Sequence, residues 1–271
     1  MNKQIIFDIY RNSFILHYPN KMSSKDFYKI FDQIGGGKKL TIEYNNEKYI
    51  FEESPINDNY YVLYSFDKSE LECVSVIIDK EYKQAEIHGI GNYSTCLKDT
   101  NINVGSLLLK LTIKMLEKYK ERFNIKNIVL TDKSLKKCDS EYIKLSSMMI
   151  LLSGHTWYGK YGFRPYDLKT NKLELDIRLN NKYEKNIKIM NTITISEANI
   201  LKYIVLTKKK SIIQDVERLL KKHPTYLLKD FIKSFIHNYD NTCEYFNIFY
   251  ERLFDDIGLY NFYKNIFGLE L

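Results

Sequence analysis

The chain has 271 residues, of which 44% are hydrophobic and 14% aromatic, and its formal net charge at pH 7 is +7. This apolar content excludes a disordered chain, and the length suffices for a sizeable core, as one large domain or as one domain with a smaller second one. The positive charge is compatible with an anionic ligand or a nucleic acid but requires neither, because a lysine-rich surface also serves solubility.

The cysteines and the N-terminus indicate a soluble, cytoplasmic protein with reduced thiols. Cys73, Cys96, Cys138 and Cys243 are widely scattered, and none forms a Cys-x-x-Cys or Cys/His pair with the spacing of a zinc site. Asp8 interrupts the first apolar stretch, which lacks the apolar core of a signal peptide. No apolar run reaches the about 18 residues that a membrane span needs. We expect neither a membrane nor a metal partner.

The first third of the chain predicts a helix among antiparallel strands. A strand is expected over 4–18, and a helix over 23–34 that ends at three glycines, 35–37. These glycines are not followed by the Gly-Lys-Ser/Thr of a phosphate loop, so they serve as a helix stop. Alternating apolar residues then predict a hairpin over 39–53 with its turn at Asn45-Asn46, and strands over 60–66, 71–79 and 85–94.

The pattern changes after residue 100. Residues 104–119 form the clearest amphipathic helix, with an apolar stripe of Val104, Leu107, Leu108, Leu111, Met115 and Leu116. A short strand over 125–130 follows, so this strand and 85–94 should run parallel through a right-handed crossover. We then expect a polar loop over 133–139, a helix over 140–152, and strands over 173–179 and 187–195.

The last quarter of the chain reads as helical, with no strand pattern. A helix is expected to start at residue 196, and further helices over 211–222, 225–238 and 242–256. The prediction is an α+β fold with a central mixed sheet flanked by helices, plus a C-terminal all-helical region. The expected domains are 1–195 and 196–271.

The turn into the main helix is the first candidate site. Asn103, Val104, Gly105 and Ser106 open this helix after a strand. The N-terminus of a helix offers unpaired amides and a positive dipole end, and a glycine lets the backbone approach a diphosphate closely. The same residues are equally typical of ordinary N-capping.

Glu86 and His88 are the second candidate site. A period of two places both side chains on one face of the strand before the main helix. Either could accept a proton from a substrate ammonium, directly or through water. The alternative is an exposed carboxylate beside a histidine that only satisfies its own hydrogen bonds.

The third candidate is an aromatic turn over 157–165, between a predicted helix and a predicted strand. We expect Trp157, Tyr161 and Phe163 to be core residues. Tyr158 could act as a general acid, because a phenol with a pKa near 10 is reasonably matched to a leaving thiol with a pKa near 8.5.

The order of these features resembles the GNAT superfamily of acyl-CoA-dependent N-acetyltransferases. The resemblance extends over about 71–167 and is carried by a closing Tyr-x-Lys-x-Gly-Phe motif made of Tyr158, Lys160, Gly162 and Phe163. The family's phosphate-binding turn is Gln/Arg-x-x-Gly-x-Gly/Ala. Thr100, Asn103 and Gly105 occupy these positions here, and only Gly105 agrees.

The resemblance implies direct transfer of an acetyl group from acetyl-CoA to an amine, without a metal. Glu86 or His88 would deprotonate the amine, and backbone amides near Ile90 and Gly91 would polarise the thioester carbonyl. Tyr158 would protonate the CoA thiolate. The acceptor could be a small molecule such as an amino sugar or polyamine, or a protein lysine. The C-terminal helices could cover the acceptor groove or form a homodimer contact.

Two other functions stay open. A GNAT-like domain that has lost catalysis could serve as a binding or scaffold module, as the incomplete phosphate turn suggests. A nucleic-acid-binding protein is less favoured, because its lysine clusters, 208–210 and 221–222, lie at helix ends, where cations favour the helix dipole in any case.

Overall fold

A computed structural model describes residues 38–271 except 56–59, 67–71, 92–103, 139–140, 170–171 and 239–241. The chain divides into two compact units, Met1–Leu130 with Glu270–Leu271, and Thr131–Leu269. The division at residue 195 stays a prediction. The expected strand over 4–18, helix over 23–34 and glycines 35–37 lie outside the described residues. In the described ranges, no helix is both long and apolar enough to cross a membrane.

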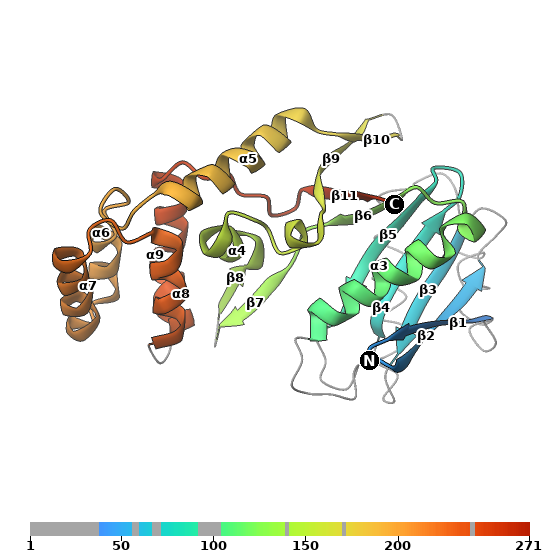
Figure 1. The fold of residues 1–271 in the computed structure, drawn as a ribbon, viewed down its shortest axis with the longest axis horizontal. Coiled ribbons are helices and arrows are strands. Elements are labelled where there is room, and N and C mark those ends of the chain that lie inside the picture. Colours follow the sequence, from blue (N-terminus) through green and yellow to red (C-terminus); the bar gives the residue numbers. More distant parts are fainter. Residues whose placement is uncertain are drawn as a thin grey trace. The chain divides into compact units, whose positions relative to one another are not determined.

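The first unit contains a six-stranded mixed sheet in the order β1 to β6 (Figure 1). Neighbouring strands are antiparallel except β5 and β6, which are parallel. The strands are β1 (Lys38–Tyr44), β2 (Glu47–Pro55), β3 (Tyr60–Phe66), β4 (Glu72–Asp79), β5 (Gln84–Ile90) and β6 (Asn127–Thr131). The predicted hairpin, strands and parallel pair are confirmed.

The turn of the first hairpin has the predicted chemistry. Asn45 and Asn46 adopt positive φ angles of 50° and 63°. Two consecutive positive φ angles give a turn whose twist matches that of the flanking strands, and asparagine tolerates this conformation better than most residues.

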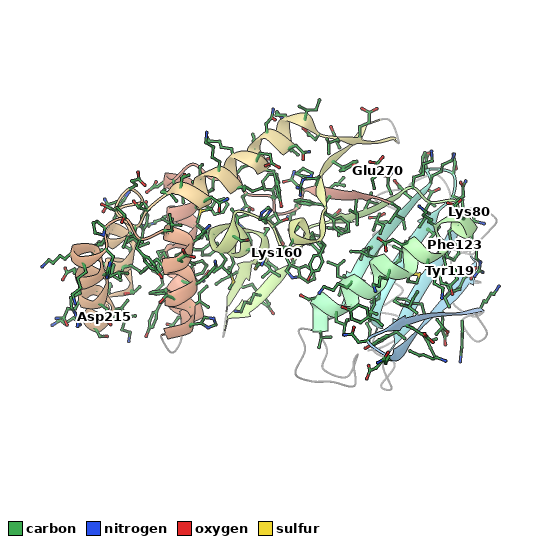
Figure 2. All side chains as sticks on the ribbon, in the orientation of Figure 1. Lys80, Tyr119, Phe123, Lys160, Asp215 and Glu270 are labelled. Carbon is green, nitrogen blue, oxygen red and sulfur yellow. The ribbon has the colours of Figure 1, made fainter. Side chains whose placement is uncertain are left out.

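Helix α3 (Val104–Phe123) connects β5 to β6, as predicted, and packs against β1, β4 and β5. Its apolar stripe is buried, including Leu108, Leu111 and Met115. The last turns carry Tyr119 and Phe123, whose rings pack edge to face with centroids 6.4 Å apart (Figure 2). The helix thus supplies the main apolar layer on one face of the sheet.

Cys73 on β4 differs from the expectation of reduced thiols. Its side chain is buried, as expected for a cysteine, but it is disulfide-bonded. The prediction of a free thiol is therefore wrong at this position, because cysteines far apart in sequence give no sign of which ones the fold brings together.

The second unit combines a three-stranded antiparallel sheet, a hairpin and most of the helices. The sheet has the order β11-β9-β10, from β9 (Arg164–Lys169), β10 (Lys172–Leu175) and β11 (Ile266–Glu270). The hairpin consists of β7 (Leu135–Cys138) and β8 (Glu141–Lys144). The helices are α4 (Leu145–Ser153), α5 (Ile177–Thr192), α6 (Leu201–Ile204), α7 (Lys210–Lys222), α8 (Leu228–Asn238) and α9 (Thr242–Asp256), with 3-10 turns η2 (Tyr158–Tyr161) and η3 (Val205–Thr207).

Helix α5 corrects two predicted strands. The expected strand over 173–179 ends at Leu175, and the expected strand over 187–195 is helical up to Thr192. The carboxylate of Asp176 accepts a hydrogen bond from the Leu179 N–H at 2.9 Å and caps the helix. The buried residues, Leu179, Tyr183, Asn186 and Met190, follow one another at helical spacing.

Four further predictions need correction. The polar loop over 133–139 contains strand β7, and the helix expected from residue 140 starts at Leu145, because β8 precedes it. The helix expected at residue 196 is a turn, with α6 starting at Leu201. The C-terminal region is not all-helical, since β11 pairs with β9. Gly268 permits this pairing, because a Cβ there would lie 2.7 Å from the Tyr166 ring.

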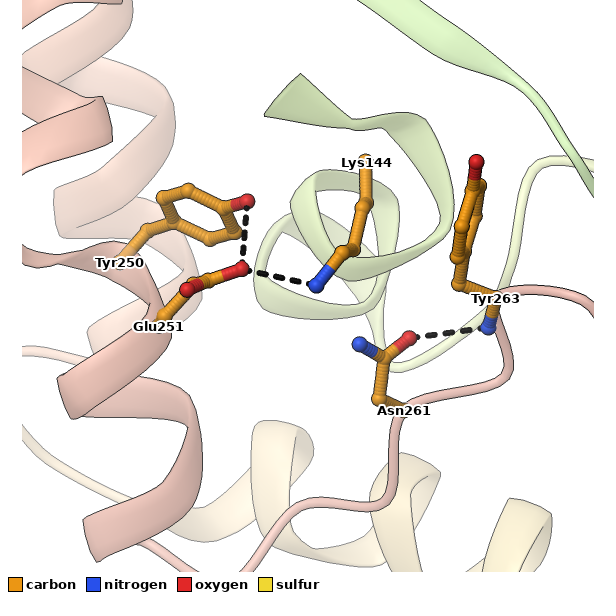
Figure 3. Close-up of polar contacts among 5 residues, drawn as sticks. All are labelled: Lys144, Tyr250, Glu251, Asn261 and Tyr263. Atoms are coloured by element: carbon orange, nitrogen blue, oxygen red, sulfur yellow. Dashed lines mark hydrogen bonds and ion pairs between the residues drawn. The ribbon is translucent and has the colours of Figure 1, made fainter. Parts of the chain in front are cut away.

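Lys144 connects the start of α4 to the C-terminal part of the same unit (Figure 3). Its Nζ lies 2.9 Å from Glu251 Oε1 on α9 and 5.9 Å from the centre of the Tyr263 ring. The Tyr250 hydroxyl donates to the same Glu251 oxygen at 3.1 Å. The helices after residue 196 are thus tied to α4 by polar contacts as well as by packing.

Candidate functional site

The predicted site residues belong to both units. Those of the first unit lie at the end of β5 and the start of α3, and they are Glu86, His88, Ile90, Gly91, Val104, Gly105 and Ser106. Tyr158 belongs to the second unit, in η2. Asn103 lies outside the described residues.

A β-bulge near the end of β5 places Glu86 and His88 together. Ser75 and Val76 on β4 pair with Gly89 and Ile87, so His88 is the extra residue between them. Such a bulge re-aims a side chain and changes the local twist of the strand. His88 Nε2 lies 3.4 Å from Glu86 Oε2, which confirms that the two side chains share a face.

This pair is shielded from solvent. The side chains of His88 and Glu86 are 12% and 16% exposed. Within the described part of the chain, His88 Nε2 is buried and has no hydrogen-bond partner. A carboxylate therefore lies beside a buried imidazole nitrogen, and both side chains are of the kinds that remove a proton from an amine.

The backbone amides of Ile90 and Gly91, which were expected to polarise a carbonyl, differ in their hydrogen bonding. The Gly91 N–H donates to the Cys73 carbonyl at 2.8 Å and is thus paired with β4. Hydrogen bonds alternate in direction along an antiparallel strand, so the Ile90 N–H points to the opposite side, toward β6. The pairing of β5 with β6 ends at Ile87 and Leu130. The Ile90 amide therefore lies beyond the last paired residues of these parallel strands.

The start of α3 has the features of an anion site. Val104 and Gly105 are buried, and the first turn contains no acidic residue. The positive end of the helix dipole is thus not neutralised by the helix's own side chains, and Gly105 adds no Cβ that would keep a phosphate away. Val104, Gly105 and Ser106 are the residues here that could hold a diphosphate.

Tyr158 is fixed by aromatic neighbours. Its ring packs edge to face on Trp157 and Phe163, with centroids 4.8 and 6.1 Å away. Phe163 is fully buried, as predicted, whereas Trp157 and Tyr161 are half-buried. Lys160, two residues further along the turn, is exposed (Figure 2). Tyr158 itself is half-buried, so the turn shields the phenol more than it shields the ammonium of Lys160.

The environment of Tyr158 opposes proton release. Burial raises the pKa of the phenol well above its usual value of 10, and the nearby charge of Asp132 raises it further. The phenol therefore holds its proton more tightly than an isolated tyrosine side chain does.

Asp132 is the functional candidate that sequence reasoning missed. It follows β6 directly and is 0% exposed. Its Oδ1 accepts hydrogen bonds from the N–H of Ser134, at 3.1 Å, and from the Ser134 hydroxyl. Burial raises the pKa of this carboxyl to about 6, against the effect of the Ser134 hydrogen bonds. The available signal was an aspartate that follows the apolar run 128–130 after one threonine.

In the described ranges, no group of three or more His, Cys, Asp or Glu side chains is arranged to hold a metal ion. Compared with known proteins, the chain matches no family model, no curated protein and no solved structure.

Proposed function

We propose that the protein is an N-acyltransferase that moves an acetyl group from acetyl-CoA to an amine by direct attack. The observation that carries the proposal is the β5–α3–β6 unit. In this unit, strand β5 bears the carboxylate–imidazole pair of Glu86 and His88, and helix α3 begins with a turn that has no acidic residue. The resemblance of the closing motif to that of the GNAT superfamily adds to it.

The proposed roles follow from the local chemistry. Gly105 and the first amides of α3 bind the diphosphate of CoA. The Ile90 N–H, beyond the paired part of β5 and β6, donates to the thioester oxygen as negative charge develops there. Glu86 and His88 accept the proton of the attacking ammonium.

A thermal-shift measurement tests the proposal. Acetyl-CoA, CoA and an adenine nucleotide are each added to the purified protein at millimolar concentration. A ligand that binds only the folded state at a hundredfold excess over its dissociation constant stabilises it by about 2.7 kcal/mol. We expect both CoA compounds to raise the melting temperature more than the nucleotide does.

A pair of glycine variants locates the binding site. Gly105→Ala places a methyl group at the start of α3 and should abolish the shift with CoA. Gly258→Ala, at the end of α9 in the other unit, should keep it, because a Cβ there meets no atom within 4 Å. The absence of any shift in the unmodified protein would remove the proposal.

A binding protein without catalysis is the second candidate, and the raised pKa of Tyr158 favours it. A phenol that does not release its proton is a poor general acid. This function predicts the same thermal shift but no transfer of the acetyl group to any amine. Loss of the thioester absorbance in a mixture with diverse amines distinguishes the two candidates.

A further inference from the structure

Strand β1 forms one edge of the six-stranded sheet in the first unit. In the described part of the chain, it pairs with β2 alone. An edge strand presents unpaired backbone N–H and C=O groups, which are a template for a further strand. An open hollow of about 820 Å³ borders this edge, and Thr41, Ile42 and Glu43 of β1 line it together with residues of α3.

The turn at Asn45-Asn46 determines which backbone groups of β1 are free. Tyr44 and Glu47 flank this two-residue turn and form the first pair of the hairpin. The flanking pair of such a turn is hydrogen-bonded, and the direction of the hydrogen bonds alternates along the strand. The free amides and carbonyls of β1 therefore belong to its odd-numbered residues, which are Lys39, Thr41 and Glu43.

A contact from helix α3 confirms this direction. The ammonium of Lys118 donates to the Thr41 carbonyl at 3.0 Å, so this carbonyl faces away from β2. Such an exposed bond contributes little net free energy, because water replaces it readily. Lys118 is therefore a weak competitor for a group that an added strand would pair.

The side chains of β1 alternate between the two faces of the sheet. Leu40 is buried on the face that α3 covers, whereas Lys39 and Glu43 are exposed on the other face. The residue opposite Lys39 on β2 is Glu52. The residue opposite Glu43 is Lys48, and the two charged groups lie 3.7 Å apart. The charges thus alternate in sign both along β1 and across the hairpin.

We propose that β1 pairs antiparallel with β1 of a second copy of this chain, about a two-fold axis at Thr41. This register places Lys39 of each protomer opposite the partner's Glu43. On the face covered by α3, Leu40 lies opposite the partner's Ile42. The outward-facing residues of one strand meet those of the other, so the free amides and carbonyls of both strands are paired.

Charge complementarity favours a second copy over an unrelated peptide. Across the four strands of two joined hairpins, one row consists of Glu52, Lys39, the partner's Glu43 and the partner's Lys48. Neighbouring charges in this row alternate in sign, and opposite charges directly across two strands stabilise their pairing. The interface is isologous, so it closes after two copies.

The small size of this interface sets its strength. A single strand pair buries little surface, so we expect a weak dimer whose population depends on protein concentration. This association does not depend on the proposed acyl transfer, and a protein that does not bind acetyl-CoA would still show it.

Sedimentation velocity of the full chain over a range of protein concentrations tests the pairing. We expect a reversible equilibrium between monomer and dimer. Lys39→Glu places like charges opposite each other twice in the dimer, and so does Glu43→Lys. Each variant should raise the dissociation constant about tenfold, because two attractive pairs become repulsive. Lys126→Glu, which changes the charge equally at an exposed position before β6, should leave the dissociation constant unchanged.

Mixing the two charge-reversal variants gives the decisive result. In a dimer of one Lys39→Glu chain and one Glu43→Lys chain, both pairs again join opposite charges. The mixture should therefore associate as well as the unmodified protein, although each variant alone associates poorly. A folding defect in either variant cannot produce this recovery.

Variants of the backbone contacts complete the test. Thr41→Pro removes an outward N–H without touching the bonds to β2 and should weaken the dimer, whereas Thr41→Val should not. Lys118→Met removes the competitor for the Thr41 carbonyl and should strengthen it. A chain that stays monomeric at high concentration, a dimer that both charge reversals leave unchanged, or a mixture that does not recover would overturn the proposal.

Discussion

Two tyrosine–aspartate pairs in the second unit have opposite electrostatic surroundings. Tyr203 donates to Asp256 Oδ2 at 2.7 Å, and Lys202 Nζ lies 2.7 Å from the same oxygen. The side chain of Asp256 is 47% exposed, and the hydrogen bond from Lys202 lowers its pKa. Asp132, whose charge acts on Tyr158, is fully buried, and burial raises its pKa.

The comparison shows that the residue types do not determine the chemistry of such a pair. Burial raises the pKa of both phenols, that of Tyr203 to about 12. The carboxyls differ, because a cation and water stabilise the ionised form of Asp256, whereas burial destabilises that of Asp132. A charged pair at the surface is a structural contact, and a buried carboxyl that titrates near neutral pH can act as a switch.

The largest expected effect comes from breaking the turn that holds Tyr158. In Gly159→Ala, the new Cβ would overlap the Tyr183 hydroxyl and lie 2.8 Å from its Cζ. Tyr183 is fully buried against Phe262 and Phe267, so it cannot move aside cheaply. We expect a loss of about 3 kcal/mol in the free energy of unfolding, measured with urea.

A double variant tests this cause. Tyr183→Phe removes the hydroxyl that Gly159→Ala would overlap, so combining the two should recover part of the lost stability. Gly258→Ala is the matched control, because it meets no neighbour and costs only the strain of a residue at φ +73°. Equal losses in both glycine variants would argue against a steric cause at residue 159.

The second expected effect is the pH dependence of protein stability that the buried carboxyl of Asp132 causes. A rise of the Asp132 pKa from 3.8 to about 6 on folding corresponds to about 3 kcal/mol. Because the folded-state pKa is raised, stability is fully present below pH 3.8 and is lost as the pH rises through 6. The free energy of unfolding of Asp132→Asn, relative to the unmodified protein, should therefore increase between about pH 4 and about pH 7.

Urea denaturation at several pH values measures this difference. A constant difference between the two proteins across this pH range would show that Asp132 ionises without penalty. It would also contradict the contrast between Asp132, whose pKa is raised, and Asp256, whose pKa is lowered.

The smallest effect concerns the exposed pair. Asp256→Asn removes the carboxylate that helps to raise the Tyr203 pKa, so that pKa should fall below about 12. The pKa of Asp256 is lowered in the folded state, so its contribution is present above pH 3.8 and is lost as the pH falls through the lowered value. A slight, salt-sensitive loss of melting temperature at neutral pH should vanish in strong acid. A larger loss than that of Gly159→Ala would reverse the comparison.

The sequence by itself determined the local elements with strong periodicity. The alternation in β1 to β5, the Asn45-Asn46 turn, the stripe of α3 and the parallel β5–β6 pair followed from side-chain spacing. The period of two in a strand also predicted that Glu86 and His88 share a face, although in the structure the β-bulge at His88 contributes to this placement. These features depend on residues close in the chain.

Tertiary structure alone decided the features that depend on distant residues. Strand β11 forms because β9 lies beside it, and Gly268 leaves room for Tyr166. The state of Cys73, the pairing of the Gly91 amide with β4 and the burial of Asp132 likewise come from packing. An aspartate after a strand looks the same in the sequence whether water reaches it or not. Its pKa, and that of Tyr158, are fixed by the desolvation that only the folded chain imposes.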